Sequence, residues 1–317
     1  MIKVIFGGLA ILLALWIGAG FAVVALSGQF EPSGRFVDVG GRKLRLVCEG
    51  PKSDKPVVWM EAGAWGLAAD FAAIQQGLTQ KGVRSCAYDR AGMGFSDPGP
   101  TPRDSAAIAS DLAKLIKASG EQGPFILMAH SMGGQHVRLF AGEHPEMVAG
   151  LVLLEATTPE MTSDPRAQPF LRRVRNVARV TAVAGSMGLT RVAYYWGDRI
   201  GLPSQGAAEK RHAFVSGRHA RTAAAEVLAW DQGSAQAGAV TLDQQWPVAV
   251  VTAGDAVRMG EWNLARRAPE QASRAGYYEN VQEAAHATLL GLTHNGAVLR
   301  AVDHVLAALA PPAVEAK

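Results

Sequence analysis

The stretch MAHSMGGQ, residues 128–135, decides the fold because it crowds small residues around one serine. Ala129, Gly133 and Gly134 all stand within three positions of Ser131. An apolar run precedes this serine and a helical pattern follows it, so Ser131 lies at a predicted strand-to-helix turn. Such a turn strains the serine backbone and exposes its oxygen, and bulky neighbours would collide with the chain. The stretch therefore predicts a reactive serine at a sharp turn, with Ala129 where the pattern G-x-S-x-G has its first glycine.

Short apolar runs lie on both sides of this turn along the chain. They lack alternation of polar and apolar residues, as strands do when both of their faces are covered. The runs cover residues 56–63, 83–90, 124–130, 147–156 and 246–254, and a last strand candidate covers 276–282. Helical patterns lie between most of them, notably at 105–118 and 133–143. Strands that alternate with helices predict an α/β fold with a mostly parallel sheet and helices on both faces.

Two segments depart from this alternation. Residues 35–50 alternate apolar and polar side chains around a Gly-Gly pair, which predicts two strands joined by a tight turn. Residues 157–245 hold helical patterns without a convincing strand. An insertion between two strands must lie over an edge or end of the sheet, and open α/β sheets bind ligands at the carboxyl ends of their strands. We therefore expect a helical lid over 157–245, inserted between two parts of one core, 35–156 and 246–312.

An uncharged apolar segment, residues 4–26, stands at the start of the chain. As a helix rising about 1.5 Å per residue it would span a hydrocarbon core of about 30 Å, and it is longer than the apolar region of a usual signal peptide. Lys3 precedes it and Glu31 follows, which favours an N-terminus inside the cytoplasm and the rest of the chain outside. We expect residues 1–27 to be a single transmembrane anchor, or alternatively a cleaved signal segment or a buried helix. Residues 28–34 are expected to be a linker.

Composition excludes some classes of protein. The chain has 317 residues, of which 49% are hydrophobic and 19% charged, and this describes a globular protein with a sizeable core. The net charge of +3 is small, and the basic residues form no long run, so we expect no nucleic-acid partner. The cysteines lack CxxC spacing and no histidine cluster has ligand spacing, so we expect neither a metal nor a cofactor.

In their order along the chain, these stretches resemble the α/β-hydrolase family. YDRAGMGFSDPGP (88–100) resembles the loop after the family's fourth strand, and AAHATLL (284–290) resembles the segment that bears its catalytic histidine. EAG (61–63) stands where the family often has a His-Gly pair. The resemblance covers roughly residues 33–310, and the expected lid is its least matched part. It implies a serine hydrolase that resembles esterases and cleaves a small-molecule ester or related acyl bond through an acyl-enzyme.

That chemistry requires a general base beside Ser131, because a serine hydroxyl is a poor nucleophile near neutral pH. Histidine suits the role, since its unperturbed pKa is about 6.5, and the resemblance assigns it to His286. Two carboxylates remain open as the residue that orients the imidazole. Glu155 ends the sixth strand, a position that some family members use, and it is the preferred candidate. Asp255 follows the seventh strand, where the family most often places its acid, but it comes earlier after Gly254 than the pattern has it.

The resemblance also implies donors for the oxyanion and a disulfide. The donors are the backbone N–H groups of Ala64 and Met132. Trp65, the next residue after Ala64, is expected to be either a wall of the pocket or a buried structural residue. Cys48 and Cys86 fall in the second and fourth strands, which lie side by side in this family's fold, and an oxidising compartment would favour a bond between them.

Two other functions remain open. Ala129 in place of glycine, the missing His-Gly pair and the displaced acid fit a non-catalytic, membrane-tethered binding protein. A cofactor-free haloperoxidase or a carbon-carbon bond hydrolase of the same fold is also compatible with a serine nucleophile. Residues 170–195 alternate basic and apolar groups at helical spacing, which is typical of a solvated lid helix or of a helix lying on an anionic membrane surface.

Overall fold

The structure, a computed structural model, describes residues 2–28 and 30–310. The first residue of the predicted anchor, residue 29 of the predicted linker and the last two residues of the predicted core, 311 and 312, lie outside the described part.

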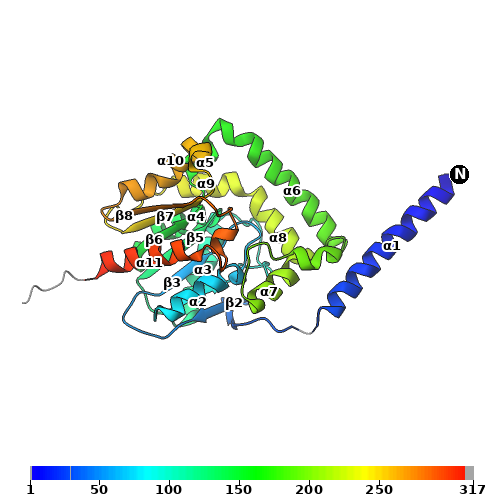
Figure 1. The fold of residues 1–317 in the computed structure, drawn as a ribbon, viewed down its shortest axis with the longest axis horizontal. Coiled ribbons are helices and arrows are strands. Elements are labelled where there is room, and N and C mark those ends of the chain that lie inside the picture. The colour runs from blue at the N-terminus through cyan, green and yellow to red at the C-terminus, as the bar shows by residue number, and fades with distance from the viewer. Residues whose placement is uncertain (1, 29, 311–317) are drawn as a thin grey trace, which may run out of the picture.

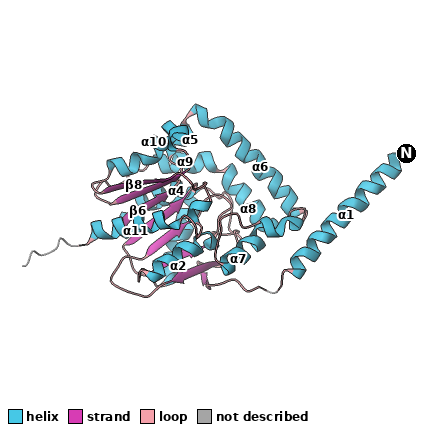
Figure 2. Ribbon diagram, viewed as in Figure 1, coloured by secondary structure: helices cyan, strands magenta, loops and turns pink. Residues whose placement is uncertain are grey.

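The described strands form one sheet of eight with the order β1-β2-β4-β3-β5-β6-β7-β8. Figure 2 shows strands of this sheet in magenta. β1 pairs antiparallel with β2, and β2 with β4, while the remaining neighbours pair in parallel. The strands are β1 (Arg35–Asp38), β2 (Lys43–Glu49), β3 (Val58–Glu61), β4 (Ser85–Tyr88), β5 (Phe125–His130), β6 (Val148–Leu154), β7 (Val248–Ala253) and β8 (Gly276–Val281). The mostly parallel sheet predicted from the apolar runs is confirmed.

Helices cover both faces of this sheet, and the strand residues alternate between the two resulting cores. Met60 and Met128 face one core together with α2 (Ala72–Gln80) and α11 (Asn295–Leu309). Trp59 and Leu127 face the other core together with α3 (Ser105–Ser119) and α4 (Gly133–Glu143). α10 (Ala256–Ala272) packs on β7 and β8. Burial on both faces explains why the central strands read as continuous apolar runs.

Helices alone make up the described secondary structure between β6 and β7 (Figure 1). We call residues 157–245 the helical insertion. Its elements are α5 (Pro159–Ser163), the 3-10 helix η3 (Pro165–Ala167), α6 (Gln168–Ser186), the 3-10 helix η4 (Arg191–Trp196), α7 (Ser204–Phe214), α8 (Gly217–Leu228) and α9 (Trp230–Gly238). Leu171 of α6, Val227 of α8 and Trp230 of α9 form a small apolar core with Met132, the residue after Ser131. The insertion therefore packs on the carboxyl end of β5.

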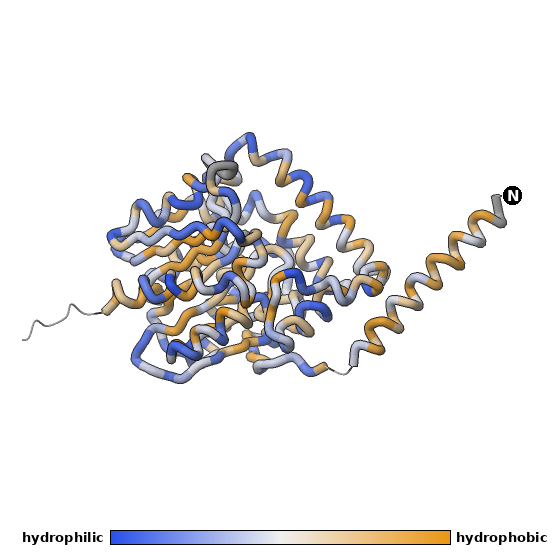
Figure 3. Tube along the Cα trace, in the orientation of Figure 1, coloured by the Kyte–Doolittle hydropathy of each residue, from blue (hydrophilic) through white to orange (hydrophobic). Residues whose placement is uncertain are grey.

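α1 (Ile2–Leu26) projects from the rest of the molecule, and apolar residues run along most of its length (Figures 1 and 3). By length and composition, its residues Ile5–Leu26 could cross a membrane. α1 packs against η4. The Trp16 indole N–H donates to the Leu189 carbonyl at 3.0 Å, and the Arg191 guanidinium lies 3.8 Å from the centroid of the Phe21 ring.

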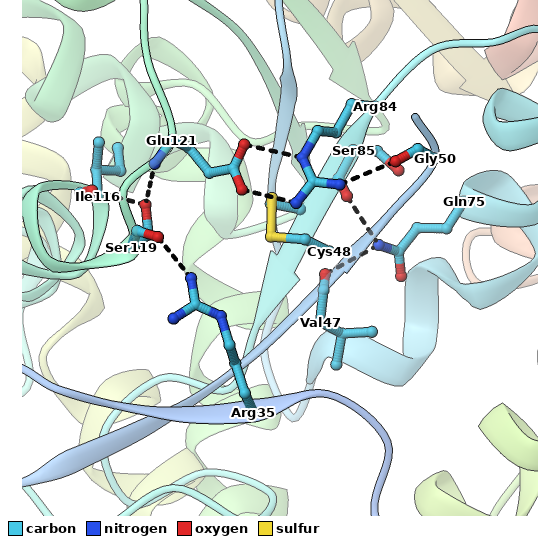
Figure 4. Close-up of a disulfide and its surroundings, with 11 residues drawn as sticks. Arg35, Val47, Cys48, Gly50, Gln75, Arg84, Ser85, Ile116, Ser119 and Glu121 are labelled. Atoms are coloured by element: carbon cyan, nitrogen blue, oxygen red, sulfur yellow. Dashed lines mark hydrogen bonds and ion pairs between the residues drawn. A yellow bond between two sulfur atoms is a disulfide. The ribbon is translucent and has the colours of Figure 1, made fainter. Parts of the chain in front are cut away.

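A disulfide joins Cys48 of β2 to Cys86 of β4, two residues that stand opposite each other in the antiparallel pair (Figure 4). Next to it, Arg84 binds both carboxylate oxygens of Glu121 at 2.8 and 2.7 Å. The disulfide agrees with the pairing expected from the sequence. The sulfur atoms of this bond form, with Glu121, the one cluster of potential metal ligands among the described residues, and bonded sulfurs are not available as thiolate ligands.

Candidate active site

Ser131 lies at a strained turn between β5 and α4. Its φ angle is 54°, in the left-handed region that residues other than glycine rarely adopt. Its carbonyl accepts hydrogen bonds from Gly134 N at 3.0 Å and Thr157 N at 2.9 Å. A Cβ on Gly133 would stand 2.7 Å from the Glu61 carbonyl oxygen, and one on Gly134 would stand 2.8 Å from Ala156 Cβ. Both glycines are therefore required by close packing, as the sequence predicted.

His286 follows β8, on the loop before α11, and a hydrogen bond of 3.0 Å joins its Nδ1 to Glu155 Oε2. Glu155 follows β6 directly and also has a left-handed backbone, with φ 49°. Its other carboxylate oxygen, Oε1, accepts from Ala253 N at 3.0 Å and pairs with Arg266 Nη1 at 3.1 Å. Burial alone would raise the pKa of Glu155, but His286 and Arg266 outweigh it and hold this pKa below its ordinary value. Glu155 is therefore an ionised partner that fixes one ring nitrogen of His286.

The alternative acid, Asp255, is an exposed residue just after β7. The His286 ring nitrogen Nδ1 instead bonds to Glu155, which comes from the neighbouring strand β6. Ser131 and His286 line the same cavity, which has a volume of about 340 Å³. The structure thus brings three of the sequence candidates, Ser131, His286 and Glu155, to one end of the sheet.

His130 has a role that the sequence did not reveal. It is the last residue of β5, on the same face as Met128, and it lines the cavity beside Ser131. Its Nε2 bonds to the backbone carbonyl of His286 at 3.0 Å, and the two imidazole rings lie 4.7 Å apart. Burial, and then the charge of His286, lower the pKa of His130 well below its ordinary value. A neutral His130 therefore donates to the His286 backbone and holds that loop in place.

The predicted oxyanion donors, Ala64 and Met132, belong to segments next to Ser131. Among the residues that the structure describes, the backbone N–H groups of Ala64 and Met132 have no hydrogen-bond acceptor. The loop that carries Ala64 passes very close to the nucleophile, since a Cβ on Gly63 would stand 2.8 Å from Ser131 Cβ. Trp65, the next residue, has a φ of 55° and lines the cavity. Ala64 lines the cavity together with Ser131, and Met132 follows Ser131 directly.

Arg90 fixes the loop that carries Ala64 through hydrogen bonds to two of its backbone carbonyls. Its Nη1 donates to the Ala62 carbonyl at 2.7 Å and its Nη2 to the Gly63 carbonyl at 2.9 Å. The guanidinium is itself fixed by two buried carboxylates, Glu61 at 2.7 Å and Glu226 of α8 at 2.9 and 2.7 Å. We call Arg90, Glu61 and Glu226 the carboxylate clamp. Burial opposes the charged form of Arg90, but Glu226 and Glu61 outweigh it and raise the pKa of Arg90, so its guanidinium stays charged.

The clamp explains the departure from the family's His-Gly pair. Glu61 is fully buried and also accepts from the Tyr88 hydroxyl at 2.5 Å, while its Oε1 lies 3.3 Å from His136 Nδ1. Burial would raise the pKa of Glu61, but Arg90 and His136 outweigh it and lower that pKa. The sequence analysis did not identify Arg90 as a functional residue, although it lies within the motif at residues 88–100. Nothing in the sequence of α8 marks Glu226 as its partner.

The walls of the cavity are mostly apolar and come largely from the helical insertion. Five aromatic side chains line it besides the two histidines: Trp65, Phe170, Trp196, Phe214 and Trp230. One polar pair stands among them, in which Lys210 Nζ lies 2.7 Å from Asp70 and also donates to the Trp65 carbonyl at 3.0 Å. An apolar cavity with few polar groups is typical of a small-molecule site.

Comparisons with known proteins agree with this architecture. The family model for the alpha/beta hydrolase fold matches residues 56–191. The bifunctional esterase/perhydrolase DCH of Acinetobacter calcoaceticus is 33% identical over 114 residues, which cover 35% of this chain and 40% of that protein. An uncharacterized vacuolar membrane protein of Saccharomyces cerevisiae is 35% identical over 134 residues, which cover 38% of this chain and 21% of that protein. The chain spans less than half of the length of these two relatives.

Solved structures resemble nearly the whole molecule. The enol-lactonase of Burkholderia xenovorans LB400 has a TM-score of 0.62 and 17% identity, with 86% of this chain and 100% of that chain covered. An esterase of Thermogutta terrifontis has a TM-score of 0.60 and 19% identity, with 87% and 99% covered. A putative epoxide hydrolase of Pseudomonas aeruginosa has a TM-score of 0.66 and 17% identity, with 89% and 100% covered. The sheet order, the match of the family model over residues 56–191 and these likenesses together establish that the chain has the α/β-hydrolase fold.

Proposed function

We propose that this protein is a serine hydrolase that cleaves an ester or related acyl bond through an acyl-enzyme. The observation that carries the proposal is the 3.0 Å hydrogen bond between His286 Nδ1 and Glu155 Oε2, at the wall of the cavity that Ser131 also lines. A carboxylate on Nδ1 leaves Nε2 free to accept a proton, which is the arrangement that a general base requires.

In the proposed reaction, Ser131 Oγ attacks the carbonyl carbon of the substrate while its proton passes to Nε2 of His286. The oxyanion that forms accepts hydrogen bonds from the N–H groups of Ala64 and Met132. As the tetrahedral intermediate collapses, His286 gives the proton to the leaving oxygen and the acyl group remains on Ser131. Water then attacks the acyl-enzyme by the same route, with His286 again taking the proton. Glu155 stabilises the imidazolium in both halves of the reaction.

The carboxylate clamp is a positioning device in this mechanism. A preorganised donor is effective only if its backbone is held where the oxyanion develops. Arg90 fixes the carbonyls of Ala62 and Gly63, the two residues before Ala64, and Glu226 fixes Arg90 from the helical insertion. The insertion would thus act both as the lid of the cavity and as a support for the oxyanion loop.

Perhydrolysis at the same serine is a second candidate, because the Acinetobacter calcoaceticus relative is a bifunctional esterase/perhydrolase. Hydrogen peroxide would replace water in the attack on the acyl-enzyme and release a peracid. Like the haloperoxidase alternative, perhydrolysis needs no cofactor. It uses the same Ser131, His286 and Glu155 as hydrolysis, so only the product distinguishes the two reactions.

We further propose that α1 anchors the protein in a membrane, with residues 35–310 outside the cytoplasm. The apolar length of α1 and the name of the vacuolar membrane relative support the anchor. The disulfide supports an oxidising compartment.

A fluorophosphonate probe tests the proposed activity and excludes the non-catalytic alternative. Such a probe reacts with activated serines. The wild-type protein should therefore be labelled, and the Ser131→Ala variant should remain unlabelled. Ser131→Ala should also lose hydrolysis of small activated esters. Full activity in that variant, or an unlabelled wild-type protein, would refute the proposal.

A further inference from the structure

One face of α6 exposes apolar and basic side chains together. Val177, Val180 and Val183 are 47%, 66% and 61% exposed, and Met187, just after the helix, is 48% exposed. Arg172 and Arg173 are exposed beside them and have no partner among the described residues. We call these six residues the α6 face. Soluble surfaces seldom gather exposed apolar side chains in this way, whereas a basic amphipathic helix on a membrane surface does.

α1 meets the insertion at the end of this face. The contacts of Trp16 with Leu189 and of Phe21 with Arg191 join α1 to the segment that follows α6. Gly20 packs closely here, since a Cβ on it would stand 2.7 Å from Arg191 Cβ. Residues 5–15 of α1 are exposed and lie on the N-terminal side of these contacts, so this part of the apolar segment is free to enter lipid. A bilayer that this part of α1 enters therefore has its surface at the level of the end of α6.

The direction of α6 allows the whole helix to lie along that bilayer. In Figure 1, α6 runs across the direction of α1, and its C-terminal end points toward α1. A membrane that α1 enters at this level would accordingly extend along α6 and not cut through it. Tyr195 and Trp196, at the end of η4, are 58% and 68% exposed, and such aromatic side chains favour the membrane interface.

We propose that the α6 face lies on the surface of an anionic lipid bilayer beside the membrane helix α1. The three valines and Met187 enter the interfacial region, where their apolar area leaves water. Arg172 and Arg173 meet lipid phosphates, which accept their N–H groups.

This docking sets how substrate enters the cavity, and here the inference rests on the proposed function. Phe170 and Trp196 line the cavity and are 50% and 68% exposed, so they belong both to its wall and to the outer surface next to the α6 face. A cavity that opens beside the bilayer receives substrate from the lipid layer. The substrate class is therefore a lipid-soluble ester with an apolar acyl chain.

Site-directed spin labelling of the full-length protein tests the docking without any need for activity. Both cysteines are bonded to each other, so a single introduced cysteine takes the label. Val180→Cys carries the label on the α6 face, and Lys114→Cys carries it on an exposed position of α3. The protein is reconstituted into vesicles of phosphatidylcholine and phosphatidylglycerol, and the relaxation of each label by oxygen and by a water-soluble nickel complex is measured.

We expect the Val180 label to show a higher ratio of oxygen to nickel relaxation than the Lys114 label. Replacing Arg172 and Arg173 by Gln should lower that ratio, whereas replacing Lys114 and Lys117 by Gln, the same loss of charge on α3, should leave it unchanged. Equal ratios for the two labels in the unmodified background would overturn the proposal, and equal effects of the two charge changes would overturn the role of the arginines. The relaxation measurement does not depend on hydrolase activity, so a loss of that activity would leave both the docking of the α6 face and the role of the arginines unaffected.

Discussion

His286 and Glu155 meet through a 3.0 Å hydrogen bond although 131 positions separate them in the sequence. The carboxylate is further fixed by Ala253 N and Arg266, so it can hold the imidazole in one tautomer. This relationship favours Glu155 over Asp255, the other acid that the sequence left open.

We expect Glu155→Gln to lower kcat by about 10³- to 10⁴-fold, because an amide in this position favours the wrong tautomer of the base. Asp255→Asn is the matched control, and its kcat should stay close to that of the wild type. Steady-state kinetics on an activated ester measure both. A larger loss in Asp255→Asn than in Glu155→Gln would assign the orienting role to Asp255 instead.

Glu226→Gln tests the carboxylate clamp. The amide cannot neutralise Arg90, so the loop carrying Ala64 should loosen and kcat should fall about 10- to 100-fold, less than when a donor is removed outright. KM should change little, because the effect falls on the transition state. Glu160→Gln makes the same change at a half-exposed position of the insertion and should leave kcat unaltered. The clamp has no positioning role if Glu226→Gln, at equal folded fraction, has the kcat of the wild type.

His219 makes folding stability dependent on pH. It is buried, and desolvation lowers its pKa to about 3, while its Nδ1 accepts from Gly94 N at 3.0 Å. In the unfolded state His219 has the ordinary pKa of about 6.5. Below that pH the unfolded state therefore binds a proton that the folded state does not bind. Stability is thus complete above pH 6.5 and is lost progressively down to pH 3, by about 2 kcal/mol at pH 5.

His219→Asn keeps an acceptor for Gly94 N but does not titrate in this range. Denaturant unfolding at pH 7 and pH 5, in the same detergent, should therefore show a smaller loss of stability for the variant than for the wild type. The same loss in both proteins would mean that His219 does not contribute to the acid sensitivity.

Removing the disulfide should lower stability without altering the chemistry. Cys48 and Cys86 close a loop with a sequence separation of 38, for which chain entropy gives about 4 kcal/mol. The double variant Cys48→Ser, Cys86→Ser should unfold at a lower denaturant concentration, while kcat per folded molecule should stay the same, because the bond lies outside the cavity. An unchanged unfolding midpoint would show that the bond does not stabilise the folded chain.

Much of the fold could be predicted because its signals are local. The apolar runs coincide with the buried strands, and the small residues around Ser131 mark the turn that the close packing of Gly133 and Gly134 requires. The contacts that complete the site are not local. Arg90 meets Glu226 across 136 positions, and His130 meets His286 across 156, so neither pair has a spacing that a sequence could reveal. His130, as the last residue of β5, reaches the cavity.

The most direct measurement of the central claim is the site of covalent modification by a fluorophosphonate, mapped by peptide mass spectrometry on the full-length protein. The account predicts a single adduct on Ser131 in the wild type, and none in Ser131→Ala. It also predicts much slower labelling in His286→Ala, because the base that activates the hydroxyl is gone. An adduct on another residue, or a wild-type protein that does not react while it is folded, would contradict it.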